Sequence, residues 1–447
     1  MIFRRRIPSA APMALLLAAS VLAACQQSDA VLPGKREPVT AVLQSAAALA
    51  IAEQPNTAAP ISLPAATANR DAAQGFGTPS ARTAHPALSA APALAWSVNI
   101  GQGDSRKQRI TADPVVLGGL VYTLDADSTV SAVTTSGQLA WQRSLRPARD
   151  SEGDATGGGI AAEDGTIYVS LGYGELAALD ASTGAVRWTQ QLDATGSGRP
   201  TVFGGLVYLM VGDNTGWALE TSNGRIAWQI GSGTDINNVL GAPAPALTED
   251  LAIFAFGSGE IQAVFRRGGL RRWDASVLGE RPGRALSKID DVTGAPVVDG
   301  NVVYAGNQAG RMVALDAGSG TRIWTANDGA ISAMYPVGGS VFALTDTNEL
   351  VRLDAGDGTR IWGVRLPNFV NNRPRRIAEV YAHHGPVVAG GLVRVASSDA
   401  QLRSFNPTDG SLAAVTEIPG GGATTAPVVA GRTLYVVNRN GQLLAYR

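Results

Sequence analysis

From about residue 93 to the end of the chain, apolar and polar residues alternate in short runs separated by turn residues. A typical unit begins with an apolar run that ends in an aromatic residue, such as GGLVYTL (118–124). A polar turn follows, then an alternating run such as GRMVALD (310–316), a turn built on glycine and a last run that ends in tryptophan. Alternation with a period of two, broken by Gly, Asn, Asp and Ser, predicts short antiparallel strands joined by hairpins.

The unit returns along the chain at a spacing typical of a four-stranded propeller blade. Its terminal tryptophans stand at positions 141, 188, 228, 273, 324 and 362, and a seventh unit carries Ala414 in the tryptophan position. The eighth unit (426–447) supplies only three strands, whereas ALAWSVNI (93–100) supplies a lone strand before the first unit. We therefore predict an all-β, eight-bladed propeller of four-stranded antiparallel blades, in which the N-terminal strand closes the last blade. Such closure leaves no open sheet edge at the chain ends.

The first residues have the pattern of a secretory signal. Three arginines (4–6) precede an apolar run that is too short to span a bilayer and ends near Ala24. The run ends in LAAC (22–25), which resembles the lipobox of bacterial lipoproteins, and the resemblance implies cleavage before Cys25 and its acylation, palmitate included. The alternative is an ordinary signal peptide with a chance cysteine. Gln26 after the cysteine favours the outer membrane, with the protein held by its lipid anchor and facing the periplasm.

The chain is expected to divide into a signal peptide (1–24), a lipidated and mostly disordered N-terminal tether (25–92) and a propeller (93–447). The tether is rich in Ala, Pro, Ser and Thr and has no sustained period. Cys25 is the only cysteine, so neither a disulfide nor a cysteine-based metal site is expected. Removal of residues 1–24 takes away three arginines and no acid, which leaves a net charge of −4. That charge argues against nucleic acid as a partner.

The phrase LDAxxGxxxW, as in LDASTGAVRW (179–188) and LDAGDGTRIW (353–362), resembles the PQQ-type β-propeller repeat. The resemblance covers 93–447 and implies that the tryptophans pack between neighbouring blades. Quinone-dependent dehydrogenases with this repeat also need an adjacent cysteine pair, calcium ligands and a catalytic aspartate. Adjacent His383 and His384 would face opposite sides of a strand and do not form a metal site by themselves. We therefore expect a scaffold rather than an enzyme, with no cofactor.

The lipobox, the propeller and the segment LPGKREPV (32–39) together resemble the BamB family of propeller lipoproteins, alphaproteobacterial type. This family belongs to the β-barrel assembly machinery. The resemblance implies binding to the periplasmic domain of BamA and to other subunits of the machinery. It also implies assistance to nascent outer-membrane proteins during insertion. A quinone (PQQ)-dependent dehydrogenase-like propeller and a generic periplasmic protein-interaction propeller are the alternatives.

Three connections between blades are longer than a propeller needs, namely 229–246, 274–296 and 363–386. Blade-to-blade connections emerge on one face of the ring, and long loops on a rigid scaffold commonly carry binding. Segments of the first two connections match the BamB family, which implies partner contacts at Asp290, Asp291, Thr293, Asn237, Val239 and Leu240. Thr293 and Leu240 depart from the residues that the family most often has there. Arg376, with Arg373 and Arg375, would pair with the two aspartates or with a partner.

Overall fold

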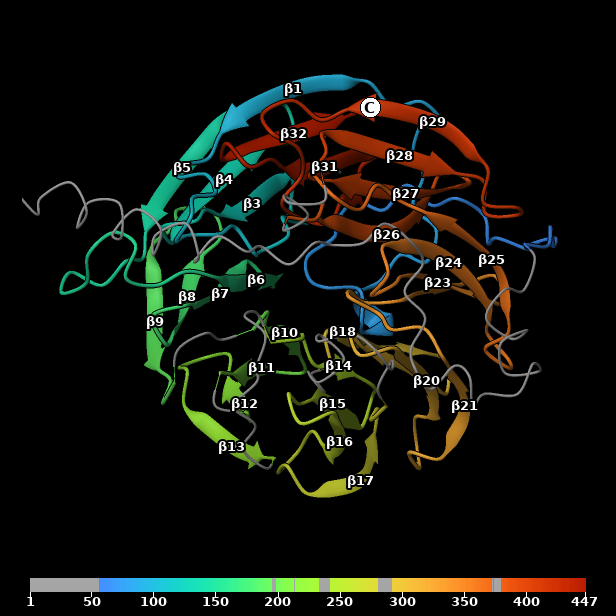
Figure 1. The fold of residues 1–447 in the computed structure, drawn as a ribbon. Coiled ribbons are helices and arrows are strands. Elements are labelled where there is room, and N and C mark those ends of the chain that lie inside the picture. Colours follow the sequence, from blue (N-terminus) through green and yellow to red (C-terminus); the bar gives the residue numbers. More distant parts are fainter. Residues whose placement is uncertain are drawn as a thin grey trace, which may run out of the picture.

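The structure is a computed structural model that describes residues 56–194, 198–212, 214–232, 242–279, 292–371, 373 and 379–447. Its strands form eight four-stranded sheets, and every pairing between neighbouring strands of a sheet is antiparallel. The sheets stand around a central channel as the blades of a ring (Figure 1). The predicted eight-bladed propeller is therefore confirmed.

The blades are numbered in chain order, and in each blade the first strand lies at the channel. Blade 1 contains β2 (Val115–Leu117), β3 (Leu120–Leu124), β4 (Thr129–Thr134) and β5 (Leu139–Ser144), and blade 2 contains β6 (Gly158–Glu163), β7 (Thr166–Leu171), β8 (Glu175–Asp180) and β9 (Val186–Gln191). Blade 3 contains β10 (Thr201–Phe203), β11 (Leu206–Val211), β12 (Thr215–Glu220) and β13 (Ile226–Gly231), and blade 4 contains β14 (Ala246–Leu247), β15 (Leu251–Ala255), β16 (Glu260–Phe265) and β17 (Arg271–Ser276). Blade 5 contains β18 (Gly294–Asp299), β19 (Val302–Asn307), β20 (Arg311–Asp316) and β21 (Arg322–Ala326), and blade 6 contains β22 (Tyr335–Val337), β23 (Ser340–Leu344), β24 (Glu349–Asp354) and β25 (Arg360–Arg365). Blade 7 contains β26 (His383–Ala389), β27 (Leu392–Ser397), β28 (Gln401–Phe405) and β29 (Leu412–Glu417), and blade 8 contains β30 (Val428–Ala430), β31 (Thr433–Val437), β32 (Gln442–Tyr446) and β1 (Leu94–Asn99).

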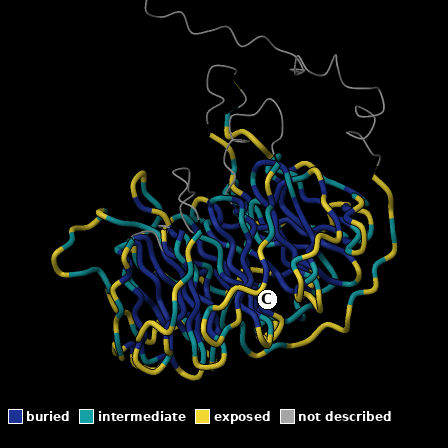
Figure 2. Tube along the Cα trace, turned by 90° about the horizontal axis from the view of Figure 1, so that it is seen from below, coloured by how far each residue is buried: buried dark blue, intermediate teal, exposed yellow. Residues whose placement is uncertain are grey.

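The N-terminal strand closes the ring as the sequence predicts. β1 pairs with β32, with Trp96 opposite Ala445 and Asn99 opposite Gln442, and the two strands lie side by side at the top of Figure 1. The last blade is thus built from both ends of the propeller. Buried residues fill the blades, while exposed residues gather at the turns and along the rim (Figure 2).

The repeated tryptophans join a blade to the next at seven of the eight junctions, as the resemblance implied, and blade 7 has Ala414 at the tryptophan position. The Trp141 indole N–H donates to the carbonyl of Ala181 in blade 2 at 3.0 Å, and the Trp188 N–H donates to Thr221 in blade 3 at 2.9 Å. The turn of the next blade places a glycine against the indole ring. At Gly184 a β-carbon would lie 2.6 Å from a ring atom of Trp141, so only glycine fits this junction. In six blades the indole ring also lies near an aromatic ring of the same blade, and the two ring centroids are 5.8–6.0 Å apart.

The segment before the propeller differs from the prediction of a mostly disordered tether. Residues 56–92, here called the strap, pack against the ring; residues 25–55 of the predicted tether lie outside the described residues. The strap begins beside β25, where the Asn56 side chain makes two hydrogen bonds of 2.9 Å with the backbone of Gly363. It then crosses to the centre of the ring, where its short 3-10 helix η4 (Pro79–Ala81) lies (Figure 1). Thr67 pairs with the backbone around Pro86, so the strap forms a closed loop over the channel.

The strap packs against the ring because the inner edges of the sheets need hydrogen-bond acceptors. The innermost strand of each blade has one unpaired edge, and its buried N–H groups need acceptors. The strap supplies these acceptors at equivalent positions in blades 1 to 5, with donor–acceptor distances of 2.7–3.0 Å: Val116 to Ala72, Ala162 to Ala73, Val202 to Gln74, Leu247 to Thr78 and Val298 to Gly77.

The strap also reaches the remaining three blades. Blade 6 has Pro336, without an N–H, at the equivalent position, and there Tyr335 donates its hydroxyl to the strap carbonyl of Ala84 at 3.0 Å. In blade 7 the N–H of Gly390 donates to Pro86 at 3.0 Å, and in blade 8 the N–H of Gly431 donates to Asn69 at 2.7 Å. The strap therefore bonds to all eight blades.

Two buried arginines hold the ends of the strap. Arg352 of β24 is 2% exposed and donates to the carbonyls of Ala59 at 2.6 Å and Pro60 at 2.9 Å. Arg394 of β27 is fully buried and donates to the carbonyls of strap residues 89 and 90 at 2.8 and 3.0 Å. Burial lowers the pKa of Arg394 to about 10. Backbone carbonyls thus stabilise both buried cations, as such cations require.

Candidate functional site

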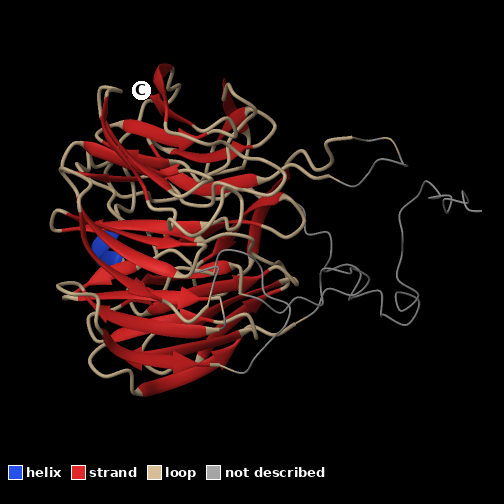
Figure 3. Ribbon diagram, turned by 90° about the vertical axis from the view of Figure 1, so that its left-hand side faces the viewer, coloured by secondary structure: helices blue, strands red, loops and turns tan. Residues whose placement is uncertain are grey.

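The three long connections leave the ring on the face opposite the strap. The strap contacts turns between the first two strands of several blades, such as those at Gly390 and Gly431, whereas connections between blades lie at the other ends of these strands. Figure 3 shows η4 at the left-hand face of the ring. We refer to the opposite side as the connection face.

The structure describes one of the seven predicted partner-binding residues. Thr293 lies just before β18, half-buried, and its hydroxyl donates to the carbonyl of Ala330 at 2.9 Å. This bond ties the connection before blade 5 to the connection before blade 6. Six other predicted residues lie outside the described residues, as do Cys25 and Arg375: Asp290, Asp291, Asn237, Val239, Leu240 and Arg376.

The described part of the third connection forms the stem of a hairpin. Phe369 pairs with Val380, the N–H of Val370 donates to Glu379 at 3.0 Å, and the N–H of Tyr381 donates to residue 368 at 2.8 Å. The stem exposes apolar side chains, with Phe369 at 37%, Val370 at 44% and Val380 at 53%. Exposed apolar side chains beside polar loops are typical of protein-binding surfaces.

This apolar stem is a feature that the sequence analysis missed, because it considered only the charges of the connection. The signal was present, since the segments NFV (368–370) and EVY (379–381) each contain two apolar residues that lie outside the strand pattern of any blade. Leu278, at the start of the second connection, is also 54% exposed. Two of the three long connections therefore present apolar side chains near the ring.

A cavity of about 1000 Å³ occupies the channel. Its lining includes Asn69 and Arg82 of the strap and the described flanks of two long connections, residues 242–245 and 379–386. His383 and His384 both contribute to this lining. The imidazole of His383 also bonds to the Ser397 hydroxyl and to the carbonyl of residue 367 at 2.7 and 2.8 Å. Burial in the channel wall lowers the pKa of His384 to about 4, so the imidazole is neutral near pH 7.

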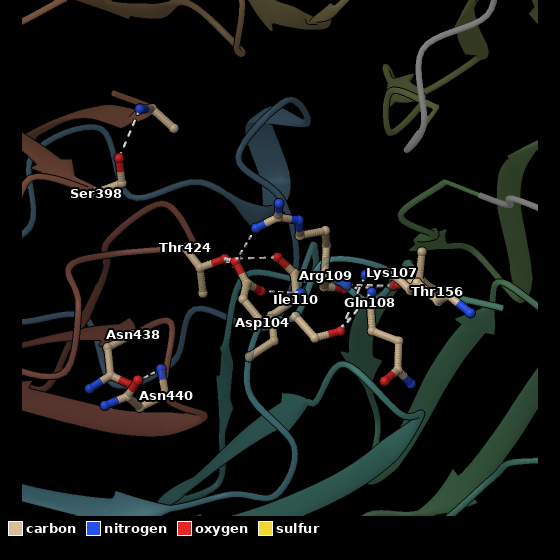
Figure 4. Close-up of polar contacts among 12 residues, drawn as sticks. Asp104, Lys107, Gln108, Arg109, Ile110, Thr156, Ser398, Thr424, Asn438 and Asn440 are labelled. Atoms are coloured by element: carbon tan, nitrogen blue, oxygen red, sulfur yellow. Dashed lines mark hydrogen bonds and ion pairs between the residues drawn. The ribbon is translucent and has the colours of Figure 1, made fainter. Parts of the chain in front are cut away.

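Carboxylates at this cavity hold the connections in place. Asp104 accepts hydrogen bonds from the N–H of Ile110 at 2.8 Å and from the Thr424 hydroxyl, and forms an ion pair with Arg109 at 3.3 Å (Figure 4). Thr156 accepts a hydrogen bond of 2.6 Å from the backbone of Arg109. Asp104 therefore joins the loop before blade 1 to the loop before blade 8.

Asp113, which also lines the cavity, has a similar structural role. It forms an ion pair with Arg199 of the connection before blade 3 and accepts the N–H of Ala426 at 2.7 Å. Among the residues that the structure describes, no group of three or more His, Cys, Asp or Glu side chains is placed to hold a metal ion. The polar groups of the cavity thus organise the connection face.

The family model for outer membrane protein assembly factor BamB matches residues 126–364 and 319–447. The chain belongs to the BamB family. BamB of Yersinia pestis is 25% identical over 360 residues, which cover 79% of this chain and 88% of that protein. BamB of Bordetella pertussis is 25% identical over 356 residues, covering 79% and 86%.

A solved structure agrees with the fold of this BamB family member. The crystal structure of BamB from Moraxella catarrhalis superimposes with a TM-score of 0.64 at 18% identity and covers 80% of this chain and 99% of that chain. Within the described part of the chain, no helix is long and apolar enough to cross a membrane. The family model and both relatives carry the name of an outer membrane protein assembly factor.

Proposed function

We propose that the protein is a non-catalytic scaffold lipoprotein of the β-barrel assembly machinery. It binds the periplasmic domain of BamA through the connection face and assists the insertion of outer-membrane proteins. The observation that carries the proposal is that the two faces of the ring are built differently. The strap fills the centre of one face by bonding to all eight blades. The three long connections lie on the other face, and the described flanks of two of them carry exposed apolar side chains.

Capture of BamA tests the proposal. The tagged lipoprotein is purified from detergent-solubilised membranes, and the amount of co-purified BamA is measured. Phe369→Asp combined with Val380→Asp places charge on the exposed apolar stem, so we expect capture to fall at least about tenfold, a loss of about 1.4 kcal/mol. The matched control is Leu139→Asp combined with Val186→Asp, since these side chains are also 46% and 44% exposed but lie on outer strands of blades 1 and 2. Equal capture by both double variants contradicts the proposed face.

The residues implied by the family resemblance are tested in the same assay. Asp291→Arg reverses a charge on the second connection, and Leu240→Asp adds one to the first. Breaking a desolvated charge pair at an interface costs about 2–5 kcal/mol. We expect each variant to weaken capture of BamA without changing the melting temperature. Undiminished capture by the combined variant excludes these connections as the contact.

Anchoring by Cys25 is tested separately. We propose that Cys25 is acylated and holds the protein at the outer membrane, facing the periplasm. Metabolic labelling with palmitate should mark the wild-type chain and not Cys25→Ala, and the variant should leave the membrane fraction. A labelled Cys25→Ala variant, or an unlabelled wild-type chain, rules out this anchor.

A further inference from the structure

The turn between β16 and β17 of blade 4 departs from the other blades. In five blades this turn begins with a polar residue eight positions before the tryptophan position, for example Asp180, Asp316 and Asp354. Their carboxylates accept backbone N–H groups of the turn at 2.8–3.1 Å. Blade 4 has Phe265 there, and the segment reads FRRGGLRR (265–272), which we call the basic turn.

The arginines of the basic turn are not needed to form it. Gly268 and Gly269 provide the two positive φ angles, +102° and +69°, and the N–H of Gly269 donates to the carbonyl of Phe265 at 3.0 Å. The carbonyl of Arg266 accepts the indole N–H of Trp228 at 2.8 Å, as the corresponding backbone does in other blades. The turn is therefore anchored by its backbone, which leaves its side chains for another role.

Two of the four guanidinium groups of the basic turn have no partner among the described residues. Arg266 folds back onto the ring of Phe203 at 4.5 Å and donates to the carbonyl of residue 249 at 2.7 Å. Arg271 lies 3.8–3.9 Å from two carboxylates and is 57% exposed. Within the described residues no hydrogen bond or ion pair engages the exposed side chains of Arg267 and Arg272.

An apolar side chain stands among these cations. Leu270 is 70% exposed, more than any other large hydrophobic residue in the described part of the chain, and Phe265 is 39% exposed. The turn lies on the strap face, since Arg266 bonds to the turn between β14 and β15. It is thus directed away from the connection face that is proposed for BamA.

We propose that the basic turn docks on an anionic phospholipid surface, a contact that rests on the proposed lipid anchor. Arginine binds phosphate groups with its planar fork of donors, while a protruding leucine enters the boundary of the acyl chains. Basic residues beside an anionic bilayer are attracted within about a Debye length, roughly 8 Å at physiological salt. A projecting leucine ringed by cations fits a deformable lipid surface better than an acidic peptide, which would need a groove to enter.

Vesicle binding tests this inference without the acyl anchor. The chain 26–447, which contains every described residue, is mixed with vesicles of phosphatidylcholine alone or with added phosphatidylglycerol, and bound protein is separated by flotation. We expect binding only to the anionic vesicles. Arg267→Glu combined with Arg272→Glu should reduce the partition coefficient at least about tenfold, and this loss should disappear at high salt, where wild-type binding is also screened. Leu270→Ser should reduce binding severalfold at every salt concentration.

The matched control reverses the same number of charges elsewhere. Arg225→Glu combined with Arg432→Glu changes two exposed arginines in turns of blades 3 and 8, and this variant should bind vesicles nearly as the wild type does. Equal losses in both double variants, or equal binding to the two kinds of vesicle, overturn the proposal. Binding of the wild type to an acidic peptide but not to anionic vesicles also overturns it. Capture of BamA separates this inference from the proposed function, because the basic-turn variants should retain that capture.

Discussion

At the scale of single residues, the junction between blades depends on a glycine that faces an indole ring. Gly184 has φ +70° and a β-carbon would meet Trp141 at 2.6 Å, whereas Gly165 has φ +71° with nothing within 4 Å of that position. The two glycines therefore share the backbone strain and differ only in packing. Such a pair separates the cost of conformation from the cost of a displaced ring.

We expect Gly184→Ala to lower the free energy of unfolding by about 3 kcal/mol, since it adds overpacking to the cost of a left-handed alanine. Gly165→Ala should cost about 1 kcal/mol, from the backbone alone. Urea unfolding followed by tryptophan fluorescence measures both. Equal losses for the two variants contradict the packing role of the glycine.

A second residue-scale prediction concerns His384. Burial lowers its pKa in the folded chain from 6.5 to about 4, while nearby Asp113 opposes this shift. In the unfolded chain the imidazole takes up a proton as the pH falls through 6.5, so the unfolded state binds more protons between pH 6.5 and 4. The stabilisation from neutral His384 is therefore fully present above pH 6.5 and is lost as the pH falls through about 4.

His384→Gln removes this titration and should flatten the dependence of the unfolding midpoint on pH in that window. Denaturant unfolding at a series of pH values checks the slope. His383→Gln is the comparison, because burial also lowers the pKa of His383 but its imidazole bonds to Ser397 and to a carbonyl. An unchanged slope in His384→Gln shows that other groups cause the acid sensitivity.

At the scale of elements, the strap is part of the folded propeller. It accepts N–H groups from the inner strands of blades 1 to 5, and buried Arg352 and Arg394 bind its carbonyls. Blade 7 shows the effect on the repeat, because Arg394 takes a position that is aromatic in six blades and Ala414 takes the tryptophan position. Strap residues 89 and 90 accept hydrogen bonds from Arg394, and strap residue 92 accepts one from Thr416, two residues after Ala414. Both exceptions in the repeat therefore lie in strands that bond to the strap.

Truncation tests the strap. The chain 93–447 lacks it, and the chain 56–447 retains it while lacking everything before. With each intramolecular hydrogen bond contributing about 1 kcal/mol, we expect the loss of the strap to cost on the order of 5 kcal/mol. Hydrogen exchange should also become faster at the amides of Val116, Ala162 and Val298. Equal unfolding midpoints for the two chains contradict a stabilising strap.

At the scale of the whole molecule, closure of the ring gives every blade a neighbour on both sides. Trp96 on the closing strand and Trp188 in the interior of the chain have equivalent surroundings. Their indole N–H groups donate to the next blade at 3.2 and 2.9 Å, and each lies 6.0 Å from a tyrosine ring. A closed ring should therefore respond alike to damage at either position.

We expect Trp96→Ala and Trp188→Ala to lower the free energy of unfolding by similar amounts, about 3 kcal/mol each, in a single transition. Thermal and denaturant unfolding, followed by circular dichroism, measure both. In an open array of blades the terminal variant would lose less and would unfold its end blade separately. That outcome contradicts closure of the ring by β1.

The sequence by itself determined the blades, their number and the closure of the ring. Alternation with a period of two and glycine turns are local features, so the sequence shows them in every repeat. The unpaired strand at 93–100 matched the strand missing after residue 447. The connection face followed from propeller geometry, whereas its apolar stem was missed because Phe369 and Val380 become neighbours only through a pairing across the connection.

Only the tertiary structure decided that residues 56–92 pack against the ring. The strap has no period of its own, since it bonds largely through backbone carbonyls, which every residue carries and no sequence pattern displays. The N–H groups that its acceptors bind belong to blades that lie far apart in the chain. These groups come together only in the completed ring. Ala414 was visible as an exception to the repeat, whereas the role of Arg394 depended on a segment about 300 residues earlier whose carbonyls it binds.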